Sequence, residues 1–206
     1  MFVDINIRPA RPEHLRPILN QAARFNYRLV AVEGLSGESL MDLDISIRVV
    51  PRFTYSDLRS LSRGREPRNH LIAYELCDTS AIKALDKLRS RVNVLKLTNK
   101  ALSNIKRRHL RLLKNCRIPI EISLNDAMID GRLDHGFLIG FGKLVPYIEA
   151  GHIDLILSSG AGNQYELLHP LTAIAVLKEL GLSYLTALKA LTTSPSRLLE
   201  GSRAWI

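Results

Sequence analysis

The histidines and cysteines of this sequence are the side chains best suited to hold a catalytic metal ion, and their spacing predicts no such site. Metal ligands must converge at suitable spacings. The six histidines are scattered and form no HxH, HxxxH or HExxH pattern. The two cysteines, Cys77 and Cys116, form no CxxC pair. We therefore expect neither a metal ion nor another cofactor.

Carboxylates and serines offer the remaining candidates for catalysis. Four carboxylates fall near the ends of predicted strands: Glu75, Asp78, Glu121 and Asp126. They could form a carboxylate pair, but no partner base or metal accompanies them, so catalysis is not favoured. The stretch Ser158-Ser159-Gly160-Ala161 follows a buried strand, where barrel enzymes place functional residues. It lacks a GxSxG elbow, and it is either a binding loop or a turn built from small residues.

Lysine and arginine are distributed unevenly along the chain. The net charge is +9, from 29 Lys and Arg against 20 Asp and Glu. Residues 91–117 hold nine of these basic side chains and no carboxylate, whereas residues 31–90 and 131–206 are balanced. A localised cationic patch concentrates polyanions and speeds their association. Nucleic acid is therefore the leading class of partner.

The stretch from 99 to 117 predicts an amphipathic helix over 101–116. At 100° per residue, its apolar arc holds Leu102, Ile105, His109, Leu112, Leu113 and Cys116. The opposite side holds Lys100, Arg107, Arg111 and Lys114. Without carboxylates for (i, i+4) pairs, these cations repel one another by a few tenths of a kcal/mol per pair, and a polyanion would relieve that repulsion. A merely solvated helix face is the competing interpretation, and His109 is interpreted as a packed side chain rather than a ligand.

Further cations are expected where predicted strands end: Arg8 after the first strand, Arg48 and Arg52 after the third, and Lys96 and Lys100 after the fifth. They could share one rim of the fold. Because guanidinium groups suit phosphate oxygens, such a rim would bind anions and continue the basic helix. Ion pairs with Asp44 or Glu75 are the competing interpretation.

These side chains would be positioned by an alternation of strands and helices. Apolar, β-branched runs predict strands at 2–7, 28–33, 44–50, 71–76, 92–97, 119–124 and 153–159. Amphipathic segments predict helices near 12–26, 79–91, 101–116, 134–150, 166–181 and 183–200. Strands separated by helices pair in parallel through right-handed crossovers.

This alternation predicts a single domain over residues 1–206, an α/β, TIM-barrel-like (β/α) barrel. Seven strands rather than eight are expected, because the chain is shorter than the roughly 250 residues typical of that fold. A doubly wound open sheet is the alternative, although neither GxGxxG nor GxxxxGK[ST] occurs. No apolar run approaches the roughly 20 residues that cross a bilayer, and no signal-peptide pattern begins the chain. We expect a cytoplasmic protein without membrane association.

Three blocks of the sequence resemble one known family. The stretch LSSGAGNQYELLHPLTAIAVLKELGLSYLTALKALTTSPSRLLE (157–200) resembles the C-terminal signature of ribonuclease P protein component 3, the archaeal counterpart of a eukaryotic nuclear ribonuclease P subunit. FVDINIR (2–8) and IPIEISLNDAM (118–128) are similar to further family blocks in the expected order. The resemblance implies a protein subunit that supports the catalytic RNA in removing the 5′ leader of precursor tRNA.

The same resemblance implies a PHP-related barrel. PHP phosphoesterases carry Asp-x-His-x-His on the first strand, with the histidines as metal ligands, whereas this chain reads Asp4-Ile5-Asn6-Ile7-Arg8. Arginine stays protonated and cannot ligate a metal. The resemblance therefore implies a chain that is not itself catalytic. The alternative is a metal-dependent PHP-like phosphoesterase with a displaced ligand set from Asp4, Glu75, His135 or His152.

The family also implies partners and contact residues. The implied partners are ribonuclease P RNA, precursor tRNA, a small ferredoxin-like protein subunit and other ribonuclease P proteins. By the family pattern, Arg132 and Lys143 lie where basic RNA contacts are expected. Leu168 stands where family members carry Arg, which puts that contact in doubt, and His169 is the candidate substitute. The predicted RNA-binding residues are Arg8, Arg48, Lys96, Lys100, Arg107, Arg111, Lys114, Arg132 and Lys143.

Overall fold

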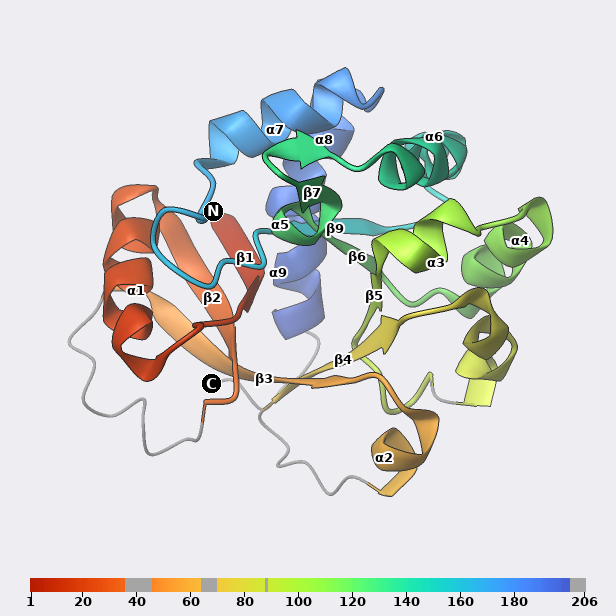
Figure 1. The fold of residues 1–206 in the computed structure, drawn as a ribbon, viewed down its shortest axis with the longest axis horizontal. Coiled ribbons are helices and arrows are strands. Elements are labelled where there is room, and N and C mark those ends of the chain that lie inside the picture. The colour runs from red at the N-terminus through yellow and green to blue at the C-terminus, as the bar shows by residue number, and fades with distance from the viewer. Residues whose placement is uncertain (36–45, 64–69, 88, 201–206) are drawn as a thin grey trace.

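Seven parallel strands form one sheet that curls into a barrel (Figure 1). The structure is a computed structural model that describes residues 1–35, 46–63, 70–87 and 89–200. The strands are β1 (Phe2–Ile7), β2 (Tyr27–Glu33), β3 (Arg48–Tyr55), β4 (Leu71–Leu76), β5 (Val94–Leu97), β6 (Ile120–Ser123) and β9 (Leu155–Ser158). Their spatial order follows their chain order. That order is typical of a barrel, because the order of a doubly wound sheet reverses at a switch point. The predicted barrel is confirmed.

The seam between β1 and β9 is closed by a short set of backbone contacts rather than by a full ladder. Ile7 forms an isolated parallel bridge with Ala161. The Gly160 N–H donates to the Asn6 carbonyl at 2.9 Å, and the Arg8 N–H donates to the Ala161 carbonyl at 2.8 Å. The carboxylate of Asp4 completes the seam by accepting the Ser159 N–H at 3.2 and 3.3 Å.

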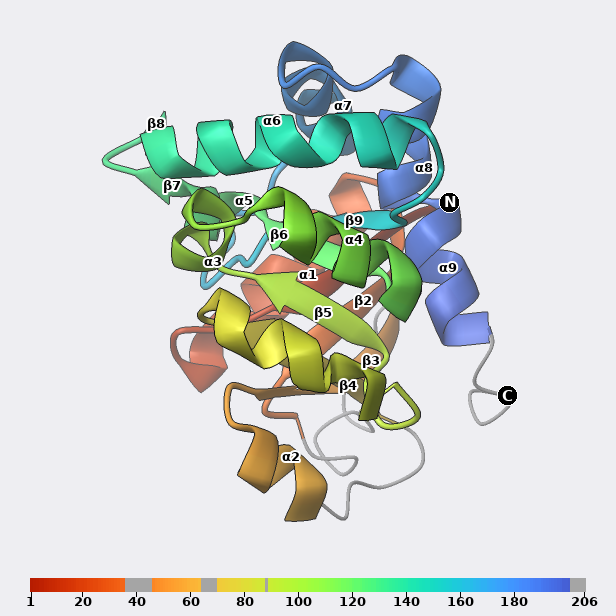
Figure 2. The same ribbon diagram turned by 90° about the vertical axis from the view of Figure 1, so that its right-hand side faces the viewer.

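Helices surround the barrel on the outside (Figures 1 and 2). The α-helices are α1 (Leu15–Arg24), α2 (Leu58–Arg63), α3 (Asn99–Ser103), α4 (Arg107–Cys116), α5 (Leu124–Ala127), α6 (His135–Glu149), α7 (Pro170–Glu179), α8 (Tyr184–Leu191) and α9 (Thr193–Glu200). The 3-10 helices are η1 (Pro12–His14) and η3 (Thr79–Lys87), and β7 (Met128–Ile129) pairs with β8 (Arg132–Leu133) in an antiparallel hairpin. Within the described residues, no helix is long and apolar enough to cross a membrane.

Two predicted elements differ from the structure in ways that move candidate residues. The third strand was expected at 44–50, of which 44 and 45 lie outside the described residues. In the structure β3 begins at Arg48 and continues through Pro51 to Tyr55. The helix expected over 101–116 is divided into α3 and α4. The short elements α2, α5, β7 and β8 were not predicted, because segments of two to six residues show little periodicity.

The inward-facing side chains divide the barrel interior into an apolar part and a polar part. Toward the amino ends of the strands lies a buried apolar cluster: Val3, Ile5, Leu29, Ala31, Val50, Leu71, Ala73, Val94 and Ile156. Leu198 of α9 packs against this cluster and covers that end of the barrel (Figure 2). Toward the carboxyl ends the buried side chains are charged or polar: Arg52, Lys96, Glu121 and Ser158. The apolar part stabilises the fold, and the polar part forms the mouth.

Candidate nucleic-acid interface

The cations at the mouth of the barrel are held in ion pairs with carboxylates. The ammonium of Lys96 lies 2.8 Å from Oε1 of Glu75 and 2.7 Å from Oδ2 of Asp126. The guanidinium of Arg8 pairs with the other oxygen of Asp126. Burial acts to raise the pKa of Asp126, but its hydrogen bonds with Lys96 and Arg8 outweigh burial and hold the pKa below its usual value. Lys96 is only 2% exposed.

A second ion pair lies deeper in the mouth and is fully buried. Nη2 of Arg52 lies 2.8 Å from Oε2 of Glu121. Arg52 also donates from Nη1 to the Ile5 carbonyl at 2.6 Å, and the Ser158 hydroxyl donates to Oε1 of Glu121 at 2.6 Å. The carboxylates at the strand ends therefore neutralise buried cations, as the ion-pair interpretation expected for Glu75. Asp44, the other expected partner, lies outside the described residues.

The predicted anion-binding rim is corrected by this arrangement. Arg48 does not lie at the mouth, because it is the first residue of β3 and its side chain is exposed at the amino end of the barrel. The cavity of about 210 Å³ at the mouth is lined by Glu33 and Glu75 as well as by Arg8 and Lys96. Its charges are balanced, so the mouth does not attract phosphate strongly.

The stretch Ser158 to Ala161 is a turn of small residues, one of the two interpretations that its sequence allowed. Gly160 has φ +70°, and a Cβ there would overlap the hydroxyl of Ser123 and approach the Arg8 guanidinium to 2.7 Å. The Ser159 hydroxyl accepts the Ala161 N–H at 3.0 Å. These contacts hold the chain against β1, so the stretch closes the barrel.

His109 caps the start of α4, directly after the break between α3 and α4. The Lys106 N–H donates to Nδ1 of His109 at 3.2 Å, so the His109 side chain caps the first turn of α4, and the His109 N–H donates to the Lys106 carbonyl at 2.8 Å in the same turn. Burial, and then the charges of Arg108 and Lys106, lower the pKa of His109. Only 6% of His109 is exposed. It is a packed capping residue, as its place in the apolar arc suggested.

The cations of α3, α4 and their flanking residues lie on the surface. We call the set the α3–α4 basic face; it consists of Lys100, Lys106, Arg107, Arg108, Arg111, Lys114 and Arg117, all exposed. The buried side of α4 is formed by His109, Leu110, Leu113 and Cys116. No ion pair joins the basic face to a carboxylate among the described side chains. Asp78 is near enough to Lys100 for that charge to help lower the pKa of Asp78, but the face as a whole keeps a large excess of positive charge.

Sequence reasoning missed three members of this face, Lys106, Arg108 and Arg117. A wheel drawn for one continuous helix placed all three outside the arc of the other cations. Lys106 lies in the break before α4 and Arg117 follows α4 in a left-handed conformation, so helical angles do not describe these two residues, and Arg108 lies at the edge of the polar side. The run without carboxylates was the signal that could have included them.

Helix α6 extends the surface beside α3 and α4. Figure 2 looks onto this side, where α6, the α3–α4 pair and η3 lie next to one another. Lys143 of α6 is exposed, and its ammonium donates to the Ile105 carbonyl at the break, at 3.2 Å. Arg132 is exposed in the β7–β8 hairpin that precedes α6. Lys143 thus lies on a helix that contacts α3 and α4, and Arg132 lies in the hairpin that leads into that helix.

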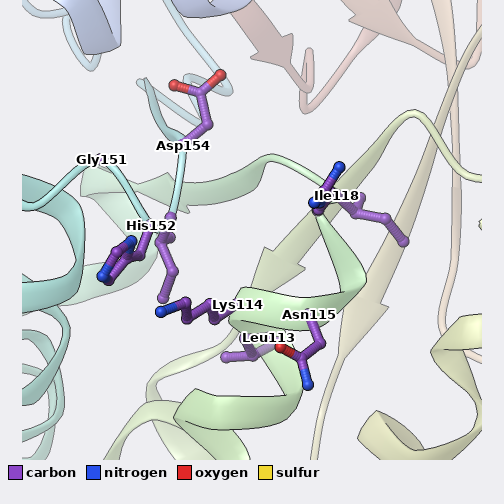
Figure 3. A pocket seen from close by; sticks show the side chains of 9 residues that line it. Leu113, Lys114, Asn115, Ile118, Gly151, His152 and Asp154 are labelled. Atoms are coloured by element: carbon purple, nitrogen blue, oxygen red, sulfur yellow. The ribbon is translucent and has the colours of Figure 1, made fainter.

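A cleft of about 550 Å³ lies at the C-terminal end of α4 (Figure 3). It is lined by Leu113, Lys114, Asn115, Arg117, Ile118, Gly151, His152, Ile153 and Asp154. These residues come from α4, from the connection between α4 and β6, and from the loop between α6 and β9. Lys114 belongs both to the cleft and to the α3–α4 basic face.

Comparison with known proteins assigns the family. The model of the family described as RNase P subunit p30 matches residues 1–205. The chain belongs to the RNase P subunit p30 family. It is a protein subunit of ribonuclease P, and a PHP-like phosphoesterase is not favoured.

Solved structures agree with the barrel fold. A chain in a cryo-EM structure of archaeal ribonuclease P with mature tRNA is similar, with a TM-score of 0.72 and 17% identity over 96% of this chain and 90% of that one. A probable mandelate racemase from Alicyclobacillus acidocaldarius has a TM-score of only 0.34 and 16% identity over 92% of this chain and 46% of that one. Curated protein sequences contain no match.

The positions of the PHP metal ligands do not fit a metal ion in this p30 subunit. Asn6 is fully buried, and Arg8 pairs with Asp126. Burial raises the pKa of Asp4 to about 6, against hydrogen bonds from Ser159 and Asn6 that lower it. Within the described residues, no three His, Cys, Asp or Glu side chains are placed to share a metal ion.

Leu168, which stands where family members carry Arg, lies beside the seam of the barrel. The Tyr27 hydroxyl donates to the Leu168 carbonyl at 3.0 Å. His169 is the N-cap of α7: its Nδ1 accepts the Leu171 N–H at 3.2 Å, and its ring lies edge-on to Phe25 at 5.0 Å. These contacts give His169 a role in capping and packing.

Proposed function

We propose that this p30 subunit binds RNA within ribonuclease P through its α3–α4 basic face and is not itself catalytic. The RNA subunit cleaves precursor tRNA to remove the 5′ leader, and this chain supplies electrostatic and structural support. Its proposed partners are ribonuclease P RNA, precursor tRNA, a small ferredoxin-like protein subunit and other ribonuclease P proteins. Its proposed location is the cytoplasm.

The excess positive charge of the basic face carries this proposal. Seven exposed cations lie within 18 residues of sequence, from Lys100 to Arg117, with no carboxylate between them. Arg107 and Arg108 also occupy the first turn of α4, where the helix dipole disfavours positive charge. The folded protein therefore holds repulsion that bound phosphates relieve, and phosphate contacts of this kind dominate affinity for nucleic acid.

The predicted contact residues divide into two groups in this proposal. Lys100, Arg107, Arg111, Lys114, Arg132 and Lys143 lie on α3, α4, α6 and the β7–β8 hairpin, and we assign them to RNA. Arg8 and Lys96 are assigned instead to the ion pairs of the barrel mouth. Arg48 lies at the amino end of the barrel and is not assigned to this interface.

The salt dependence of RNA binding tests the proposal. Each phosphate neutralised contributes roughly 0.7 to 0.9 to the slope of log affinity against log salt. Changing Lys100, Arg107, Arg111 and Lys114 to Ala should therefore lower the slope for ribonuclease P RNA by roughly 3 to 4. A matched variant removes the same charge from exposed cations elsewhere: Arg16, Arg24, Lys178 and Arg197.

The matched variant should keep the slope of the unmodified protein. An unchanged slope in the first variant, or equal losses in both, would contradict the proposal. Reconstitution gives an independent measurement, in which precursor tRNA cleavage by the RNA subunit is followed with and without this chain. No change in rate, affinity or magnesium requirement would remove the proposed supporting role.

A further inference from the structure

The cleft at the end of α4 combines an apolar floor with one positively charged wall. Leu113, Ile118 and Ile153 are each at least 93% buried and form the floor. Lys114 and His152 are exposed, and Figure 3 shows them reaching into the same side of the cleft from α4 and from the loop after α6. A flat apolar ligand that carries negative charge fits this combination, because the floor desolvates one part, while the cations Lys114 and Arg117 hold the other.

The negative charge of Asp154 is already balanced from outside the cleft. Its Oδ1 accepts the Ser194 hydroxyl at 2.6 Å and lies 3.2 Å from the Lys189 ammonium. The cations Lys114 and Arg117 on the other wall have no ion pair among the described side chains. The cleft as a whole therefore favours an anion.

The cleft continues a row of cations along α4. Arg107, Arg111 and Lys114 follow one another at i, i+4 and i+7, which spans about 10 Å at 1.5 Å per residue. Lys114 ends this row at the cleft. A backbone of phosphates that follows the row would bring its next nucleotide to the apolar floor.

Arg117 supplies an independent observation. It follows the last turn of α4 in a left-handed conformation with φ 55°. Glycine is the usual residue there, because a side chain in this conformation costs of the order of 1 kcal/mol. The chain thus keeps a strained arginine where glycine would be easier, and that arginine lines the cleft.

From these observations we infer that the cleft binds one unstacked nucleotide of a bound RNA. The base lies on the floor formed by Leu113, Ile118 and Ile153, with the planes of His152 and Arg117 available for stacking, and Lys114 holds the adjoining phosphate. Unstacked bases in RNA complexes are commonly held by aromatic or arginine planes in this way. The inference rests on the proposed function, since it requires RNA on the α3–α4 basic face.

Binding to a fluorescent single-stranded RNA and to a duplex of the same length tests the inference. The change of His152→Ala should weaken single-strand binding roughly 5-fold to 100-fold, the range for loss of one stacked base. It should change duplex binding less than about 2-fold, because a paired base cannot enter the cleft. His152→Phe should restore single-strand binding, since a ring without charge can still stack. His135→Ala, at an exposed histidine outside the cleft, should change neither.

The change of Arg117→Gly separates binding from folding. Glycine relieves the backbone strain, so the urea midpoint should stay the same or rise while single-strand affinity falls. Equal losses for single strand and duplex, no rescue by His152→Phe, or a lowered midpoint that accounts for the weaker binding would each overturn the inference. Loss of a protein subunit from the complex with RNA affinity intact would identify the cleft as a protein interface.

A failure of the proposed function and a failure of the cleft inference give different experimental results. If removing Lys100, Arg107, Arg111 and Lys114 leaves the salt slope unchanged, the RNA-binding face itself is wrong. If that slope falls while His152→Ala and Arg117→Gly keep full single-strand affinity, only the cleft inference is wrong.

Discussion

Replacing Asp4 by Asn should change how the stability of the barrel depends on pH. Asp4 is 1% exposed and closes the seam by accepting backbone N–H groups from Asn6 and Ser159. Burial raises its pKa from 3.8 to about 6. A carboxyl group whose pKa is higher in the folded state binds its proton more tightly there, so the stability it contributes is present in full below pH 3.8 and is lost as pH rises through about 6.

The size of this loss follows from the two pKa values. One pKa unit corresponds to about 1.4 kcal/mol, so the difference between 3.8 and about 6 corresponds to about 3 kcal/mol. Because Asn does not ionise, Asp4→Asn lacks this loss. The free energy of unfolding of the variant minus that of the unmodified protein should rise by about 2 kcal/mol between pH 4 and pH 7, because part of the full difference lies below pH 4, and stay nearly constant above pH 7.

Urea unfolding at half-unit steps from pH 4 to pH 8 measures this difference. Subtracting the two curves removes the titration of all other groups, and a constant offset from the lost second oxygen does not alter the slope. Asp57→Asn is a control at an exposed carboxylate, whose pKa is lowered by the Ser60 and Arg59 N–H groups. Its difference curve should be flat over this range. Parallel curves for Asp4→Asn and the unmodified protein would refute the assignment of a raised pKa to Asp4.

Three further predictions concern packing, charge and capping. Gly160→Ala should destabilise the protein by more than Gly34→Ala in urea unfolding, because both positions have positive φ but only at Gly160 does a Cβ meet other atoms; equal losses would remove the steric explanation. Arg52→Met should cost about 3 to 5 kcal/mol by leaving Glu121 buried without its partner, and adding Glu121→Gln should recover part of that loss; additive losses in the double-mutant cycle would contradict this. His109→Gln should keep the cap of α4. The unmodified protein should lose stability below about pH 6.5, because the pKa of His109 is lower in the folded state and the unfolded chain therefore binds the proton more readily, and the variant should lack this loss. The same pH dependence in both proteins would count against this prediction.

The sequence alone was sufficient to predict the architecture and to locate the excess positive charge along the chain. Alternating apolar runs and amphipathic segments predicted seven parallel strands in a barrel, because the periods of strand and helix are local properties of the chain. The missing carboxylates between residues 91 and 117 are likewise visible without a structure. The resemblance to the ribonuclease P family rested on blocks of residues, and the family match over residues 1–205 confirms it.

Only the tertiary structure decided which cations are available. Lys96 and Lys100 are four residues apart, yet Lys96 is buried between Glu75 and Asp126 while Lys100 is exposed on α3. Asp126 follows Lys96 by 30 residues, so no local pattern indicates their contact. The place of Arg48 depended on where β3 begins relative to its neighbours, and the cleft at His152 depended on the packing of the loop before β9 against α4. Composition and periodicity act over a few residues, whereas ion pairing and clefts depend on which distant segments the closed barrel brings together.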